Sequence, residues 1–162
     1  MKRLTAILLI TFSSTTTMAK EIKTKILIKA TSEKVWSILI NIENYPNWNP
    51  FIKSIKGDMK IGNKIIARIE PPQSKVMIFK PKILTYKTYE ELSWLGHFLF
   101  VGLFDGEHKF KIVDNRNGTT TFIQSELFRG VLVPFFSKKL DNNTKKGFEE
   151  MNKKLKELAE LR

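Results

Sequence analysis

The feature that most constrains the fold is a change of hydrophobic period late in the chain. Residues 51–129 contain short strand-like segments separated by turn residues, whereas after Pro134 apolar residues recur every three or four positions. The second pattern predicts one long amphipathic helix. Its stripe comprises Phe136, Leu140, Thr144, Gly147, Phe148, Met151, Leu155 and Leu158. Such a stripe needs a second layer to cover it, and the preceding strands provide one.

The part of the chain before residue 51 adds one strand and two short helices. Residues 21–29 alternate between lysine and mostly β-branched residues, a pattern typical of a half-buried strand. Thr31 or Ser32 is suited to cap a helix that ends near Asn41. The prolines within residues 43–50 then permit only a short helical turn.

The strand signals define the rest of the fold. We expect strands near residues 51–57, 63–70, 75–87, 89–96, 106–114 and 119–129. Pro81 interrupts one of them, which predicts an edge position or a bulge. The short connections predict antiparallel pairing. The order β-α-α-β6-α therefore predicts an α+β fold, in which a curved antiparallel sheet wraps around the C-terminal helix.

Composition excludes several classes of function. The 162 residues are 42% hydrophobic and 27% charged, which suits one globular domain and is too apolar for disorder. Cysteine is absent, so disulfides, thiol catalysis and thiolate metal sites are excluded, and two histidines leave little for a metal site. The net charge is +12, but the lysines are scattered, so we interpret them as a solvated surface. We expect no metal, no cofactor and no nucleic-acid partner, and the oligomeric state stays open.

Residues 1–19 have the three-part pattern of a secretory signal peptide. A lysine–arginine pair precedes the apolar run 4–12, which is too short to span a bilayer, and residues 17–19 provide a cleavage site. The alternative is a translation start at Met18. We therefore expect a single domain over residues 20–162, exported or periplasmic after cleavage, or cytoplasmic if translation begins at Met18.

Two neighbouring strands place polar residues on the concave face of the sheet. His108 shares a face with two apolar residues, and Gln124 shares a face with Glu126 and two phenylalanines. A three-residue loop at 116–118, with its glycine in the left-handed conformation, places His108 opposite Glu126; the other permitted register places it opposite Gln124. Asp105 is expected at the rim of this cluster.

A buried histidine and carboxylate must pair with each other or bind something. One interpretation is an anchor for the carbonyl or hydroxyl of a ligand in an apolar pocket. A second is a buried pair that fixes the strand register. A third makes His108 a general acid or base oriented by Glu126. The sequence marks no nucleophile, so we favour the first two.

We expect a ligand cavity of about 300–1,000 Å³ between the sheet and the long helix. Its predicted lining is Trp94, His108, Phe110, Phe122, Gln124, Glu126, Phe148 and Met151. The run 98–104 is too apolar for an exposed loop and has glycines on both sides, so we expect a gate of Phe98, Phe100 and Phe104 that contacts ligand or, transiently, a membrane. The alternative is that this run, like residues 130–136, simply fills the mouth of the sheet.

Four stretches of the chain resemble the START-like, helix-grip superfamily (SRPBCC), which includes lipid-transfer domains and polyketide cyclases. They are IKTKILIKATSEKVWSILINIENYPNWNPFI, WLGHFLFVGLFDGEHKFKI, TTTFIQSELFRGVLVPFF and GFEEMNKKLKELAE. The segment GLFDGEH is similar to an uncharacterised bacterial branch of the superfamily. The resemblance implies a helix-grip fold with an internal cavity.

Members of this superfamily bind lipids, sterols and quinones, and a minority are enzymes, so the resemblance alone does not decide the function. We expect binding, transport or sequestration of a small hydrophobic molecule such as a lipid, fatty acid or isoprenoid. The first alternative is a polyketide cyclase or dehydratase-like enzyme that uses His108 and Glu126. A third hypothesis, from a different class, is an interaction module that uses the lysine surface.

Overall fold

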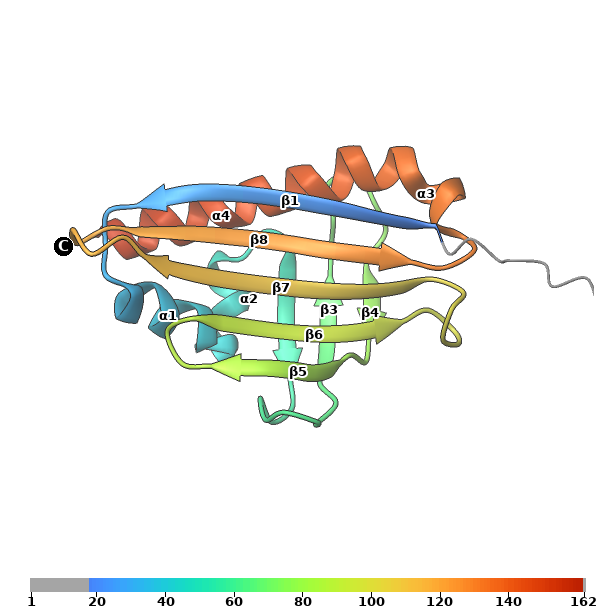
Figure 1. The fold of residues 1–162 in the computed structure, drawn as a ribbon, viewed down its shortest axis with the longest axis horizontal. Coiled ribbons are helices and arrows are strands. Elements are labelled where there is room, and N and C mark those ends of the chain that lie inside the picture. Colours follow the sequence, from blue (N-terminus) through green and yellow to red (C-terminus); the bar gives the residue numbers. More distant parts are fainter. Residues whose placement is uncertain (1–17, 162) are drawn as a thin grey trace, which may run out of the picture.

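The computed structural model describes residues 18–161, which form two antiparallel sheets and one long C-terminal helix (Figure 1). The predicted signal peptide therefore lies, except for its last two residues, outside the described part. No helix of the described residues is long and apolar enough to cross a membrane. The first elements are β1 (Ala19–Ile28), α1 (Ser32–Ile40), η1 (Ile42–Asn44), α2 (Tyr45–Trp48), β2 (Ile52–Lys56), β3 (Ile66–Ile69) and β4 (Met77–Phe79). They are followed by β5 (Lys82–Lys87), β6 (Glu91–His97), β7 (Asp105–Asp114), β8 (Thr120–Arg129), α3 (Val133–Lys139), η2 (Leu140–Thr144) and α4 (Lys145–Glu160).

The larger sheet has five strands in the order β1-β8-β7-β6-β5, and all neighbours are antiparallel. It curves around α4, which lies along β1 and β8 (Figure 1). The alternation predicted for residues 21–29 holds, because Ile22, Thr24 and Ile28 are buried while the lysines between them are exposed. The α+β helix-grip architecture predicted from the sequence is confirmed.

The smaller sheet, β2-β3-β4, was not predicted as a separate unit. The strand expected at 75–87 is in fact two strands, because the chain leaves the small sheet after Phe79 and enters the large one at Lys82. Pro81 lies at this passage, where its missing N–H removes no ladder hydrogen bond. The predicted edge position is correct, since β4 and β5 each form one edge of their sheet.

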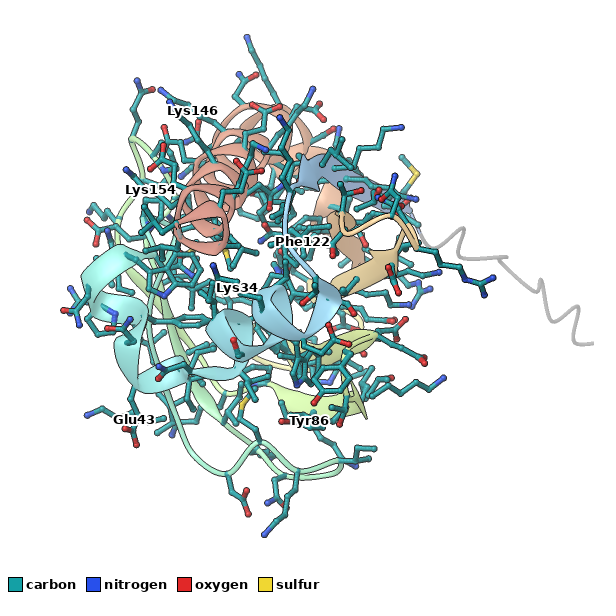
Figure 2. The ribbon with its side chains drawn as sticks, turned by 90° about the vertical axis from the view of Figure 1, so that its left-hand side faces the viewer. Lys34, Glu43, Tyr86, Phe122, Lys146 and Lys154 are labelled. Carbon is teal, nitrogen blue, oxygen red and sulfur yellow. The ribbon has the colours of Figure 1, made fainter. Side chains whose placement is uncertain are left out.

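The C-terminal helix is continuous from Val133 to Glu160, with a π-helical turn at Leu140–Thr144. Leu140, Thr144 and Phe148 follow each other at intervals of four, and the wider π turn keeps them all buried. The lysines occupy the other face, as Figure 2 shows for Lys146 and Lys154. Two members of the predicted stripe differ: Phe136 is exposed and Leu158 only half-buried.

Gly147 allows a close approach to the helix. A Cβ atom at this position would lie 2.2 Å from the ring of Phe51. Phe51 and Phe148 meet edge to face, with ring centroids 5.2 Å apart. The glycine is therefore required because an aromatic ring from the start of the small sheet packs directly on the helix backbone.

The helices α1 and α2 pack at the end of the molecule opposite to α3 (Figure 1). Thr31 caps α1, and its hydroxyl accepts a hydrogen bond from the Lys34 N–H. Tyr45 is fully buried and donates its hydroxyl to the Leu39 carbonyl at 2.7 Å. The same burial raises the pKa of Tyr45, because the charged phenolate cannot be solvated there.

Candidate ligand-binding site

The register of β7 and β8 places His108 directly opposite Glu126. This is the first of the two registers permitted by the sequence, and Gly118 in the connecting loop adopts the left-handed conformation, with φ of +77°. On its other side His108 pairs with Trp94 of β6. Strand alternation thus brings these three side chains together on the concave face.

His108 is buried with a fixed pattern of hydrogen bonds. Its Nδ1 lies 3.3 Å from Glu126 Oε2, and its Nε2 lies 3.2 Å from the amide nitrogen of Gln124. A carboxylate only accepts, so Nδ1 carries the proton and Nε2 accepts from the amide.

Aromatic rings enclose the imidazole on three sides. Trp94 stacks on it at 5.1 Å with an angle of 12° between the planes. Phe110 and Phe148 present their rings at steep angles, with centroids 4.5 Å and 5.1 Å away. His108 is 1% exposed, so the aromatic cage and Glu126 separate it from solvent.

Glu126 is the link between this buried cluster and the surface. Its side chain is 16% exposed and lies over Gly106, where a Cβ atom would be 2.6 Å from Oε1. Oε2 is held by His108. Among the residues that the structure describes, none donates a hydrogen bond to Oε1.

Beside Glu126 lies a cavity of about 40 Å³, between β6–β8 and the small sheet. Such a volume holds a few water molecules. It is lined by Ala67, Ile69, Phe79, Pro81, Trp94, Gly96, His97, Phe98, Phe104, Gly106, Glu126 and Phe128. His97 and Phe98 are the exposed members of this lining, so the mouth lies at the β6–β7 loop.

A second histidine–carboxylate pair lies at the mouth. His97 Nδ1 is 2.7 Å from Asp105 Oδ1, and Asp105 Oδ2 accepts the N–H of Gly102 at 2.9 Å. Asp105 was expected at the rim of the His108 cluster, but it faces the loop and binds His97 instead. His97 was not predicted as a site residue. The usable signal was that His97 and Asp105 stand at the ends of the two strands on either side of the apolar run, where antiparallel pairing places them opposite each other.

The model of one protein family matches residues 19–160, almost the whole described chain. The family is described as "Polyketide cyclase / dehydrase and lipid transport". The chain belongs to this family. No functionally curated protein matches it in sequence.

Several solved structures share the fold of this member of the polyketide cyclase and lipid transport family. The Zhui aromatase/cyclase from Streptomyces sp. R1128 is 8% identical, with a TM-score of 0.71 over 88% of this chain and 94% of that one. A START superfamily protein from Mycobacterium smegmatis is 21% identical, with a TM-score of 0.67 over 86% and 97%. Truncated norcoclaurine synthase from Thalictrum flavum is 15% identical, with a TM-score of 0.69 over 90% and 96%. At these identities the likeness shows the fold alone, and the family match over residues 19–160 confirms the resemblance predicted from the sequence.

In this family member, the predicted site residues divide into three groups. Trp94 and Glu126 line the cavity, together with the predicted gate residues Phe98 and Phe104. His108 lies behind Glu126 and holds it, and Gln124 in turn holds His108. The remaining members, Phe110, Phe122, Phe148 and Met151, do not line it.

The large cavity predicted between the sheet and the helix is wrong in place and size. Phe110, Phe122, Phe148 and Met151 are fully buried and fill that space. Phe110 and Phe122 stack with centroids 5.9 Å apart. Large side chains from both layers meet there, and none of the four lines the cavity beside Glu126.

Two further differences concern the rim. Phe100 does not line the cavity and is 63% exposed at the tip of the loop. The wall formed by Ala67, Phe79 and Pro81 was missed, because the sequence predicted one meander instead of a second sheet. Within residues 18–161, no three histidine, aspartate or glutamate side chains converge as metal ligands.

Proposed function

We propose that the protein binds a small hydrophobic molecule at the hollow end of the sheet and anchors it through Glu126. The observation that carries this proposal is the split role of the carboxylate. One oxygen is fixed by the buried imidazole of His108, and the other belongs to the lining of an otherwise mainly apolar cavity. A few fixed polar groups in an apolar wall are what orient a ligand in a typical binding site.

The chemistry of the anchor selects the ligand class. Glu126 is an acceptor, so the ligand needs a hydroxyl or an N–H group at its polar end. The rings of Trp94 and Phe128 surround it with apolar surface that suits an aromatic or isoprenoid body. A fatty acid fits poorly, because its carboxylate would be placed next to a second negative charge.

Entry of such a ligand requires the cavity to expand, and the loop 98–104 is the part able to move. The ends of this loop are joined by the Phe98 N–H and the Phe104 carbonyl at 2.9 Å. Its tip, Leu99 to Val101, is at least 63% exposed, so it loses little packing when it opens. This supports a gate at Phe98 and Phe104.

The test is a titration with N-phenyl-1-naphthylamine, a neutral fluorescent probe that has one N–H group. We expect enhanced fluorescence with the wild type and at least about tenfold weaker binding after Gly96→Leu, which fills the cavity. Lys111→Leu, on the exposed outer face of the same sheet, is the matched control and should bind as the wild type does. Equal affinity of Gly96→Leu and wild type would contradict the proposal.

The alternative function is a cyclase or dehydratase-like enzyme. It is favoured by the contact between a histidine–carboxylate pair and a cavity. Both nitrogens of His108 are engaged, so Glu126 would be the group that moves a proton and His108 would position it. In that case Glu126→Gln would abolish turnover of a substrate that still binds.

We also propose that residues 1–19 direct export and are removed. The proposal rests on their three-part pattern, and cleavage after Ala19 would remove only the first residue of β1. The protein isolated from its host should then begin at Lys20. An intact Met1, or a start at Met18, would contradict this.

A further inference from the structure

The end of the molecule that carries the cavity is also covered by exposed apolar side chains. The loop 98–104 and the segment 130–136 lie side by side, because the Val131 and Leu132 N–H groups donate to the carbonyls of Gly102 and Leu103, at 3.2 and 3.1 Å. Figure 1 shows the β6–β7 loop and the start of α3 at the same end of the sheet. The side chains of Leu99, Phe100, Val101, Val131 and Phe135, which we name the apolar end, are each at least 63% exposed.

This surface is not explained by the binding site. Within the loop 98–104, Phe98 and Phe104 line the cavity, whereas none of the five exposed side chains of the apolar end does. Neither residues 98–104 nor 130–137 contain a charged residue. A contiguous apolar surface of this kind marks a site of contact with a partner or a membrane.

Positive charge borders the apolar end. Lys138 and Lys139 follow in the last turn of α3, are exposed, and make no ion pair with any described residue. Arg129 lies at the end of β8, is half-exposed and forms an ion pair with Glu107 at 3.8 Å. The full chain carries a net charge of +12. Apolar tips with flanking cations are the combination that binds the headgroup region of an anionic bilayer.

The N-terminal sequence joins the domain at the same place. The carbonyl of Met18 accepts the N–H of Gly130 at 3.3 Å, next to Val131. The residues upstream of it include Lys2, Arg3 and the apolar run 4–12. Any copy that keeps its leader therefore has a second apolar segment in its sequence, upstream of Met18.

We propose that the apolar end docks on the surface of an anionic lipid bilayer, with the tips of both loops inserted among the headgroups. Docking does not depend on the ligand proposed above. If that proposal holds, docking also places the cavity mouth at Phe98 against the bilayer, so an apolar ligand passes between lipid and protein without crossing water.

The first experiment is co-sedimentation of the full chain with vesicles of equal parts phosphatidylcholine and phosphatidylglycerol. We expect binding, and a fall on the order of tenfold when Phe100→Ser and Phe135→Ser are combined. The matched control combines Ile61→Ser and Ile78→Ser, two equally exposed side chains on the small-sheet side of the molecule. The control should bind as the wild type does.

A second measurement separates the apolar end from the leader, which could hold the chain on vesicles by itself. Tryptophan is introduced by Phe100→Trp or, as control, by Ile78→Trp, and quenching by brominated phosphatidylcholine is measured above the signal of the three native tryptophans. We expect a blue shift and strong quenching for Phe100→Trp alone. Three results would each overturn the proposal. The first is equal quenching of both tryptophan variants, and the second is undiminished vesicle binding by the double serine variant. The third is a wild-type dimer that does not bind vesicles and that the double serine substitution dissociates.

Discussion

The two halves of the concave face share the same strands and differ in what they enclose. Towards α1 the inner positions are filled by large rings such as Phe110 and Phe122, and no space remains under α4. Four residues from Phe110 along β7, Gly106 faces Gly96 of β6, and both line the hollow. The backbone is the same in both halves, so side-chain size decides where a ligand can enter.

The polar cluster lies at the boundary of these halves. Along β7 the inner residues run from Phe110 through His108 to Gly106. Phe110 belongs to the filled core, His108 is buried at the boundary, and Gly106 lines the cavity. Gln124 and Glu126 hold the histidine from either side of that boundary. A hydrogen-bonded group at the edge of a rigid core can orient a ligand because its own position is fixed.

The largest effect is expected in the filled half. Phe122→Ala removes a fully buried ring and should lower the free energy of unfolding by about 3–5 kcal/mol, because the stacked neighbours cannot close the gap. Urea denaturation measures the loss. A loss below about 1 kcal/mol would mean that this half is as loosely packed as the other.

A smaller effect should distinguish two glycines that face each other in the hollow half. A Cβ at Gly106 meets Glu126 Oε1 at 2.6 Å, whereas a Cβ at Gly96 meets only Pro81 at an ordinary 3.6 Å. Gly106→Ala should therefore cost about 1–3 kcal/mol through displacement of the carboxylate. Gly96→Ala should be neutral or stabilise by about 0.4–1 kcal/mol, because alanine restricts the unfolded chain. Thermal unfolding of both variants gives the comparison, and equal losses would contradict the geometry of Glu126.

The smallest effect concerns the boundary itself. Glu126→Leu leaves the His108 N–H without an acceptor and should cost about 1–3 kcal/mol. We expect the lower part of this range, below the roughly 3–5 kcal/mol typical of a fully buried ion pair, because Glu126 is partly solvated. Glu126→Gln keeps an acceptor and should cost less than Glu126→Leu. Equal costs in urea titrations would show that the hydrogen bond does not stabilise the fold.

The register and the polar cluster could be predicted because strand alternation and a short loop leave only two pairings of His108. The position of the cavity could not. It depends on the chain turning at Pro81 into a second sheet, whereas the local pattern of residues 75–87 is that of one strand. It also depends on which large side chains meet across the layers. The hydrophobic period of the sequence does not determine these contacts. The signal that could have been used is the pair Gly96 and Gly106, since glycine inside a strand marks a close approach or a hollow.

The central claim is that the hollow half, and not the space beneath the long helix, receives the ligand. The protein contains eight glycines, so selective ¹⁵N-glycine labelling yields a simple amide spectrum with reporters in both halves. Gly96 and Gly106 report on the cavity, and Gly147 reports on the packing of α4 against Phe51. On addition of N-phenyl-1-naphthylamine, we expect the signals of Gly96 and Gly106 to shift while Gly147 stays in place. A shift of Gly147 with Gly96 and Gly106 unchanged would place the ligand under the helix and contradict the account.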